Sequence, residues 1–244
     1  MADQMDDKYS KEPQSYSDLE LEFIALNSGS ALIDRSNAGR LRFFGQDVID
    51  LMDRLTTNDL RSIDVGGGIS TVLTTNKGRV IDLLVITATA DNILCMTSPE
   101  RQKTVAEWID FYTFSEDVKV FDVSDTTAQF SMTGPTVTNT LNALGLDVSS
   151  LPRFHSSAHK LGGIDLLIWH TLSAGIPTYE VILDAVHTTV VREIFINAGV
   201  TLVGSEALEA HRISQGIPFY GSEFSDDTNP LESRLKGAIS FNKG

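Results

Sequence analysis

The stretch Thr74–Ile86, TTNKGRVIDLLVI, decides the fold prediction, because a polar turn with a glycine leads straight into an apolar, β-branched run. The run before it, ISTVLTT at residues 69–75, and the run after it, NILCMTS at residues 92–98, have the same character. Consecutive runs of this kind joined by short polar turns predict an antiparallel meander. Asp82 stands inside the central run and is therefore both part of the predicted sheet and a candidate functional residue.

Outward from this meander, strands and helices are both predicted, without strict alternation. Further strands are expected at residues 31–36, 39–45, 118–124, 127–134, 162–171 and 178–184, with a loop at 152–159. Apolar residues at helical spacing predict helices at residues 18–29, 46–55, 134–145, 187–199 and 205–216, and one that opens at Pro99. This order of elements predicts an α+β fold of antiparallel sheets with helices packed on them.

Composition excludes several classes of protein. The chain has 244 residues and a formal net charge of −14, which argues against direct binding of nucleic acid through its phosphates. Its one cysteine, Cys95, lies in an apolar run and is expected to be a buried packing residue. No apolar segment reaches the roughly 18 residues of a membrane span, and the acidic N-terminus is not a signal peptide. We expect a soluble, cytoplasmic protein.

The sequence lacks the common catalytic and cofactor motifs. It contains no phosphate loop, no dinucleotide fingerprint and no nucleophile elbow. His155 and His159 are four residues apart, as metal ligands on one helix face would be, but Pro152 disfavours a helix there and no third ligand is suggested. No metal site is predicted.

Four stretches, taken together and in order, resemble the glycine-cleavage T-protein superfamily. They are residues 30–60, TTNKGRVIDLLVI, HRISQGIPFYGSEF at 211–224 and NPLESRLKGAISFNKG at 229–244. RISQGIP and ISFNKG are most similar to the YgfZ-type folate-binding branch. In that branch the lysine and glycine precede a C-Y-x-G-Q-E signature, so the resemblance implies that the chain is truncated after Lys243 and Gly244, its match to the start of that signature.

The resemblance implies two interleaved α+β lobes around a cavity for a tetrahydrofolate-like ligand, with a C-terminal β-barrel domain missing. The expected domains are a disordered tail at residues 1–20, a first lobe at 21–50 and 127–244, and a second lobe at 51–126.

Three positions depart from the aminomethyltransferases of the superfamily. Their double acidic pair is matched here by Asp82 and Leu83, so the second carboxylate, which assists the reaction, is absent. Adjacent strand residues point to opposite faces, so Asp82 replaces it only through a one-residue slip. Thr97 stands where that group has an asparagine, and Ile176 stands in place of a pterin-binding glutamate.

Five residues are candidates for binding the ligand, each beside a structural alternative: Lys77, Arg79, Asp82, Glu180 and Arg212. The cations of NKGR form either a basic rim for a folate tail or the solvated edge of a type I′ or II′ turn. Asp82 is either solvent-facing or in the cavity with a perturbed pKa. Arg212 anchors a carboxylate or pairs with Glu209 or Asp226, and Glu180 matches a family glutamate or is a solvated strand end.

Three functions remain open. The first is a tetrahydrofolate-binding, YgfZ-like protein that supports assembly or repair of iron–sulfur enzymes, including those that modify tRNA, with iron–sulfur client proteins as partners. The second is a folate-dependent aminomethyltransferase in which Asp82 takes the acid–base role. The third is a scaffold with a vestigial pocket and no folate binding.

Overall fold

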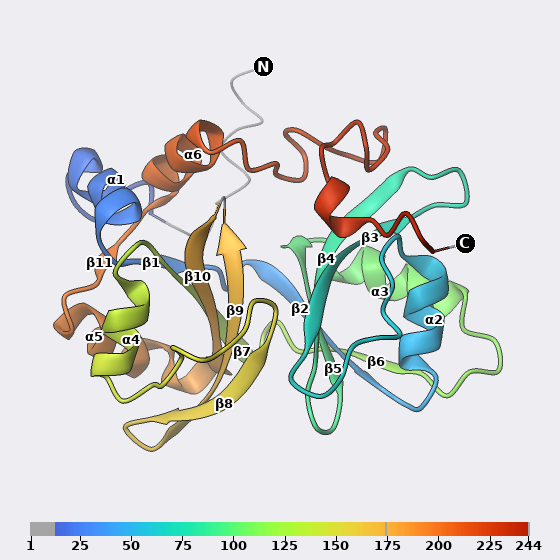
Figure 1. Cartoon of the computed structure of the whole chain (residues 1–244), viewed down its shortest axis with the longest axis horizontal. Helices are drawn as coiled ribbons and strands as arrows, with labels where there is room; N and C mark the ends of the chain where they lie inside the picture. Colours follow the sequence, from blue (N-terminus) through green and yellow to red (C-terminus); the bar gives the residue numbers. More distant parts are fainter. Residues whose placement is uncertain (1–12, 174, 244) are drawn as a thin grey trace. The chain divides into compact units, whose positions relative to one another are not determined.

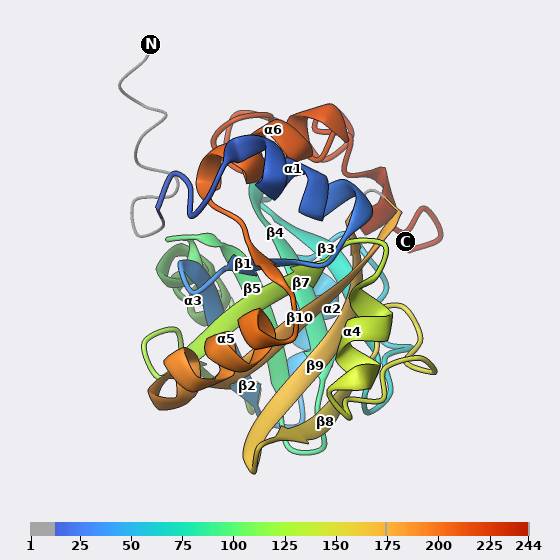
Figure 2. The same ribbon diagram turned by 90° about the vertical axis from the view of Figure 1, so that its left-hand side faces the viewer.

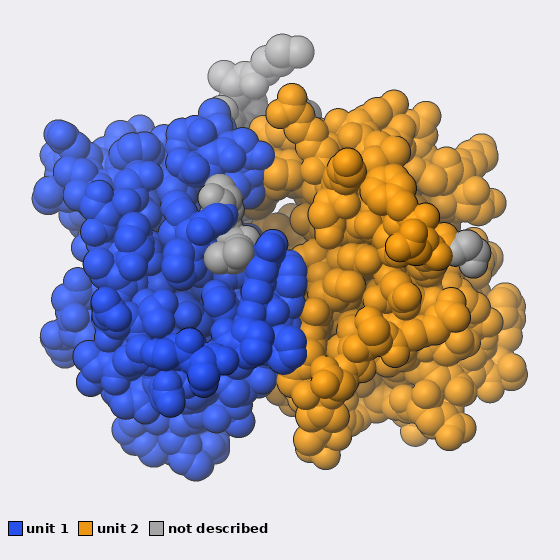
Figure 3. Space-filling model, viewed as in Figure 1, with its two compact units in different colours: residues 1–37, 125–217 blue, residues 38–124, 218–244 orange. Residues whose placement is uncertain are grey.

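The computed structural model describes residues 13–173 and 175–243, shown as a ribbon in Figure 1. The chain divides into two compact units, coloured in Figure 3. Unit 1 comprises residues 1–37 and 125–217, and unit 2 comprises residues 38–124 and 218–244.

Unit 1 is built on a six-stranded sheet with the order β11-β1-β7-β10-β9-β8. Its strands are β1 (Ala31–Asp34), β7 (Thr127–Thr133), β8 (Ser156–Leu161), β9 (Ile164–Ser173), β10 (Ile176–Asp184) and β11 (Thr201–Leu202). The short β11 runs parallel to β1, and every other pairing in this sheet is antiparallel.

The helices of unit 1 cover its sheet in two groups. They are α1 (Leu19–Ser28), α4 (Val137–Ala143), α5 (Thr188–Asn197) and α6 (Ser205–Ser214), with a 3₁₀ turn at Ala185–His187. Apolar residues of α4 and α5, such as Leu141 and Phe195, share the main core with Phe130 of β7. Helices α1 and α6 lie side by side in Figure 2 and pack Leu26 and Ala207 with the β1 residues Ala31 and Ile33.

Unit 2 has a five-stranded, antiparallel sheet with the order β3-β4-β5-β2-β6. Its strands are β2 (Ala38–Phe44), β3 (Gly68–Thr74), β4 (Val80–Ala88), β5 (Ile93–Pro99) and β6 (Lys119–Asp122). The predicted meander is confirmed as β3-β4-β5. Two helices, α2 (Val48–Leu55) and α3 (Gln102–Phe111), and a 3₁₀ turn at Lys236–Ala238 complete the unit.

Two separate apolar clusters fill unit 2. Helices α2 and α3 contribute residues such as Leu51 and Ile109 to a core with Leu84 of β4, which also contains the buried Cys95, as predicted. The second cluster holds Val72 and Val80 of the sheet together with Phe224, Leu235 and Ala238. Those last three residues belong to residues 218–243, which we call the C-terminal strap.

The α+β prediction is confirmed, but the observed units differ from the predicted lobes. Residues 38–50 and 218–243 belong to unit 2, because β2 hydrogen-bonds between β5 and β6 and the strap packs on β3 and β4. Of the expected tail at 1–20, residues 1–12 lie outside the described part. Within the remainder, Asp18 caps α1 by accepting from the Glu20 N–H.

Two local predictions are wrong. Pro99 does not open a helix: it ends β5, and α3 begins only at Gln102, because Glu100 has a φ of 62° that no α-helix accommodates. The expected loop at residues 152–159 instead leads into β8, an edge strand that pairs with β9 along its length. Only its end residues, Ser156 and Leu161, are buried, and the residues between them are exposed or half-buried, which suits a strand at the edge of the sheet.

Candidate functional site

A β-bulge in β4 sets the position of Asp82. Leu73 of β3 is opposite Asp82 while Thr74 is opposite Val80, so Ile81 is an extra residue without a partner of its own. A bulge of this kind shifts the alternation of side chains locally. Beyond it the register is regular, so Asp82 and Leu83 point to opposite faces of the sheet.

The carboxylate of Asp82 is fully enclosed. One oxygen accepts the Leu83 N–H at 2.9 Å and the other accepts the Ser98 N–H at 2.9 Å, so both are bound to backbone donors. Burial raises the pKa of Asp82 to about 6, against the opposing effect of hydrogen bonding with the Ser98 side chain, of these two backbone hydrogen bonds and of the Arg101 charge. Of the two alternatives from the sequence, the solvent-facing one is therefore wrong. Asp82 anchors the turn between β5 and α3.

That turn carries a small polar network. Arg101 donates to Ile81 O at 2.8 Å and to Asp226 at 3.0 Å, and its guanidinium lies 4.4 Å from the centre of the Tyr220 ring. The Tyr220 hydroxyl donates to the same Asp226 oxygen at 2.8 Å. Asp226, named from the sequence as a partner for Arg212, thus pairs with Arg101, and the network fastens the strap to the end of β5.

Leu83 lies on the opposite face from Asp82. It is half-buried and packs against the cluster of Val72, Val80 and Phe224. An apolar side chain therefore occupies the position where the resemblance implies the assisting carboxylate. Thr97, in place of the family asparagine, is buried and donates to Ser98 O at 2.9 Å.

A second buried carboxylate, Glu180, lies in the sheet of unit 1. It is 9% exposed, so the expectation of a solvated strand end is wrong. One of its oxygens accepts from Gln129 Nε2 at 2.8 Å and the other from the Ser131 hydroxyl. Ser131 is directly opposite it on β7, and Trp169 is directly opposite it on β9.

These residues form a polar row across the sheet face that lies opposite the main core of unit 1. Buried polar residues at alternate positions extend it: Thr133 on β7 and Thr178 on β10, whose hydroxyls lie 2.8 Å apart. Two buried polar atoms in the row, Gln129 Oε1 and Trp169 Nε1, have no hydrogen-bond partner. Buried polar atoms are almost always paired, so these two retain unused capacity to bind polar groups.

Sequence reasoning identified Glu180 but missed the partners that hold it. The available signal was the alternation of polar residues in TAQFSMT, where Gln129, Ser131 and Thr133 share one face of a strand. Ile176, matched to a family glutamate, begins β10 and contributes no carboxylate.

Lys77 and Arg79 lie in the exposed turn between β3 and β4. Gly78 N–H donates to Thr75 O and Thr75 N–H donates to Arg79 O, which closes a three-residue loop with Gly78 at a φ of 70°. The turn is a three-residue hairpin loop, so it is longer than the predicted type I′ or II′-like turn, but the positive φ that the prediction required of the glycine is confirmed. Arg79 donates to Asp227 O at 2.8 Å and holds part of the strap.

Arg212 pairs with Glu209, one turn earlier on α6, and donates to Ile217 O at 3.1 Å. The pairing with Glu209 was one of the sequence alternatives. Both side chains are largely buried, so the pair is part of the packing of α6.

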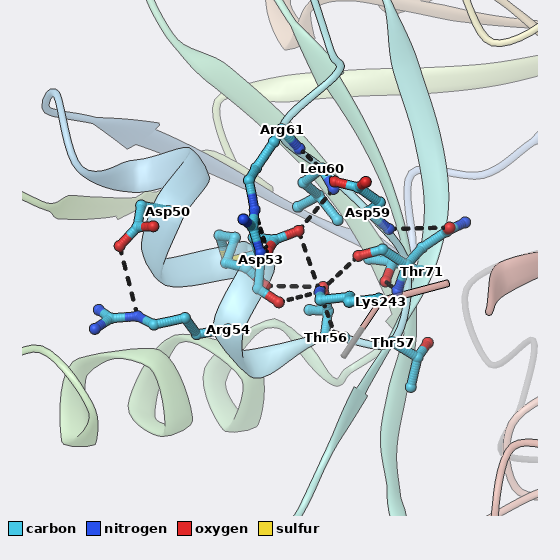
Figure 4. A network of polar contacts seen from close by, with 12 residues as sticks. Asp50, Asp53, Arg54, Thr56, Thr57, Asp59, Leu60, Arg61, Thr71 and Lys243 are labelled. Atoms are coloured by element: carbon cyan, nitrogen blue, oxygen red, sulfur yellow. Dashed lines mark hydrogen bonds and ion pairs between the residues drawn. The ribbon is translucent and has the colours of Figure 1, made fainter. Parts of the chain in front are cut away.

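Lys243 lies against the end of α2, where its ammonium donates to the carbonyl oxygens of Asp53, Thr56 and Asn58 (Figure 4). Its signature neighbour, Gly244, lies outside the described residues. This contact could not be predicted from local sequence patterns, because its partners are backbone oxygens about 190 positions earlier.

Within residues 13–173 and 175–243, no group of three or more histidine, cysteine, aspartate or glutamate side chains is arranged to hold a metal ion. His155 and His159 flank and occupy the strand β8 and share no helix. Among the described helices, none has the length and apolar character that crossing a membrane requires. An open pocket of unit 2 beside Phe44, Ile49 and Asn92 contains none of the predicted site residues.

Comparison with known proteins identifies the family. An aminomethyltransferase from Chlorobium phaeovibrioides is 28% identical over 240 residues, covering 95% of this chain and 66% of that protein. One from Thermotoga maritima is 27% identical over 239 residues, covering 95% and 65%. The chain thus spans about two thirds of the length of these relatives.

The crystal structure of glycine cleavage system aminomethyltransferase T from Bartonella henselae has the same fold, with a TM-score of 0.83 at 17% identity over 92% of this chain and 62% of that one. The family described as the GCVT N-terminal domain matches residues 3–243. The resemblance to the glycine-cleavage T-protein superfamily is thereby confirmed. The chain belongs to the GCVT N-terminal domain family.

Proposed function

We propose that this chain binds a tetrahydrofolate-type ligand and is a folate-dependent protein of the aminomethyltransferase type, active in the cytoplasm. The observation that carries the proposal is Glu180, a buried carboxylate held by two side chains within a row of buried polar residues. Burial of a carboxylate is costly unless it is hydrogen-bonded, and Gln129 and Ser131 supply those hydrogen bonds.

The chemistry of the row suits the pterin end of a folate. Each oxygen of Glu180 accepts one protein hydrogen bond and keeps further acceptor capacity. The 2-amino group and the adjacent ring N–H of a pterin form a pair of donors that a carboxylate accepts side by side. Gln129 and Ser131 hold the carboxylate in a fixed orientation, which lowers the cost of ordering it on binding.

Two relatives named aminomethyltransferase favour one-carbon transfer as the activity. A second candidate is the YgfZ-like role, in which folate binds without transfer and iron–sulfur client proteins are served. The apolar Leu83 favours this second candidate, because it removes the assisting carboxylate and Asp82 is enclosed on the other face.

Calorimetric titration of tetrahydrofolate into the chain tests the proposal. Glu180→Gln keeps the size of the side chain but removes the charge. A hydrogen bond to a charged group contributes about 1.5–3 kcal/mol, so we expect the affinity for tetrahydrofolate to fall about tenfold to a hundredfold. Glu193→Gln, an exposed glutamate of α5 in the same unit, is the matched control. Absence of binding by the wild-type chain, with an intact urea transition, would refute the folate proposal.

A transfer assay separates the two candidates. Incubation of the folate-loaded chain with an aminomethyl donor should give 5,10-methylenetetrahydrofolate if the chain is a transferase. If folate binds and no product forms even in the Leu83→Asp variant, the binding-only role is favoured.

A further inference from the structure

Lys243 Nζ lies among a group of oxygen atoms at the end of α2, which we call the oxygen cage. The cage holds more oxygens than one ammonium can donate hydrogen bonds to. Four oxygens surround Lys243 Nζ: the carbonyls of Asp53, Thr56 and Asn58, at 2.9 Å for Thr56 and 2.7 Å for Asn58, and the Asp53 carboxylate at 3.1 Å. An ammonium has only three N–H donors. The cage therefore surrounds a positive charge with more oxygens than there are hydrogen bonds to make, as a cation site does.

The electrostatics of the cage favour a single positive charge. The carbonyls at the C-terminus of a helix carry its negative partial charge and attract cations. Burial would raise the pKa of Asp53, but the Leu60 N–H, Arg61 and Lys243 hold it below its usual range, so the carboxylate stays charged. Asp53 is 1% exposed, and Figure 4 shows its carboxylate between Arg61 and Lys243.

The cage also fixes the end of the strap. Next to it the Thr57 hydroxyl donates to Ala238 O at 2.7 Å, and the Ser240 N–H donates to Thr57 O at 3.0 Å. Ala238 and Leu235 then pack on Val72 of β3. The positive charge in the cage therefore affects the stability with which the last residues of the strap pack on unit 2.

We infer that the end of α2 is a binding site for a monovalent cation, which the chain fills with the ammonium of Lys243. Without that side chain the three carbonyls and the Asp53 carboxylate would take ammonium, potassium or a small alkylammonium ion from solution. The inference is independent of folate binding, since all of its residues belong to the α2 end and the strap of unit 2.

Chemical rescue of Lys243→Ala tests the inference. Alanine empties the cage, so the urea midpoint should fall and the exchange protection of the Ser240 amide should drop. Ammonium chloride or potassium chloride should restore both, with protection rising about threefold when the ion reaches twice its dissociation constant. Tetramethylammonium chloride at equal ionic strength should not, because that ion is too large for a cage built around one lysine nitrogen.

Two further variants keep the test decisive. Lys243→Met keeps the aliphatic stem, so it should fold but leave no room for an ion, and ammonium should not rescue it. Lys236→Ala, an exposed lysine of the same strap, should show the wild-type response to every salt. Equal rescue of the alanine and methionine variants, equal effects of ammonium and tetramethylammonium, or no loss in Lys243→Ala would each overturn the inference.

Discussion

Two of the buried carboxylates, Asp82 in unit 2 and Glu180 in unit 1, are held in different ways. Asp82 is 0% exposed and both of its oxygens accept backbone N–H groups. Glu180 is 9% exposed and its oxygens accept from the side chains of Gln129 and Ser131. Backbone donors fix the path of the chain, whereas side-chain donors leave the backbone unaffected and orient the carboxylate itself.

The difference separates a folding role from a recognition role. Loss of the Asp82 carboxylate would leave two backbone N–H groups unpaired in the interior, which is a cost to the fold. Loss of the Glu180 carboxylate would leave only side-chain donors that can turn or be replaced. Four variants test this distinction, from the largest expected effect to the smallest.

Asp82→Ala should be strongly destabilising. At pH 5 the change removes the acceptor of the Leu83 and Ser98 N–H groups, and we expect a loss of about 2–5 kcal/mol in the free energy of unfolding. Urea unfolding followed by tryptophan fluorescence measures it, with the exposed Asp91→Ala as control. A loss no larger than that of the control would mean that Asp82 does not anchor the turn.

The pH dependence of stability should identify Asp82 as the titrating group. Its pKa is raised from 3.8 to about 6 in the folded chain, so protonation favours the fold. The stability it contributes is complete below pH 3.8 and is lost as the pH rises through 6, to a total of about 3 kcal/mol for a two-unit shift.

Comparison with Asp82→Asn isolates this contribution, since other groups titrate in both proteins. Between pH 4 and pH 7 the wild type should lose stability relative to the asparagine variant. Parallel curves for the two proteins would contradict the assignment.

Ser131→Ala should affect binding more than folding. The hydroxyl orients Glu180 through one hydrogen bond, so its loss should lower the affinity for tetrahydrofolate about three- to tenfold. Thr127→Ala, at the start of the same strand, is the control in calorimetric titration. If Ser131→Ala lowers the free energy of unfolding by more than it lowers the free energy of binding, Ser131 belongs with the residues that stabilise the fold.

Lys77→Ala should have the smallest effect. The side chain is exposed in the β3–β4 turn, where solvent and salt screen its charge, so affinity for tetrahydrofolate should change by less than about twofold. A tenfold loss that disappears at high salt would instead revive the prediction of a basic rim for the folate tail.

Local patterns in the sequence were enough to predict the meander β3-β4-β5, the position of α1 and the burial of Cys95. These predictions rest on periodicity and on helix-start signals between near neighbours, and a single sequence displays both.

The environments of the candidate residues could not be predicted in the same way. The bulge at Ile81 depends on the register between two strands, and the partners of Glu180 and Lys243 are about 50 and 190 positions away. A carboxylate in an apolar strand looks the same in sequence whether backbone or side chains hold it. The two units differ from the expected lobes for the same reason, since the strap returns to strands formed far earlier in the chain.

The bulge in β4 also has a consequence for how such a chain can evolve. Because the two neighbours Asp82 and Leu83 point to opposite faces, selection acts on them separately. Position 82 is constrained by the turn it anchors, whereas position 83 is constrained by its packing against Val72, Val80 and Phe224. A replacement at residue 83 therefore alters the surface on which the strap packs and leaves the acceptor of the Leu83 and Ser98 N–H groups in place.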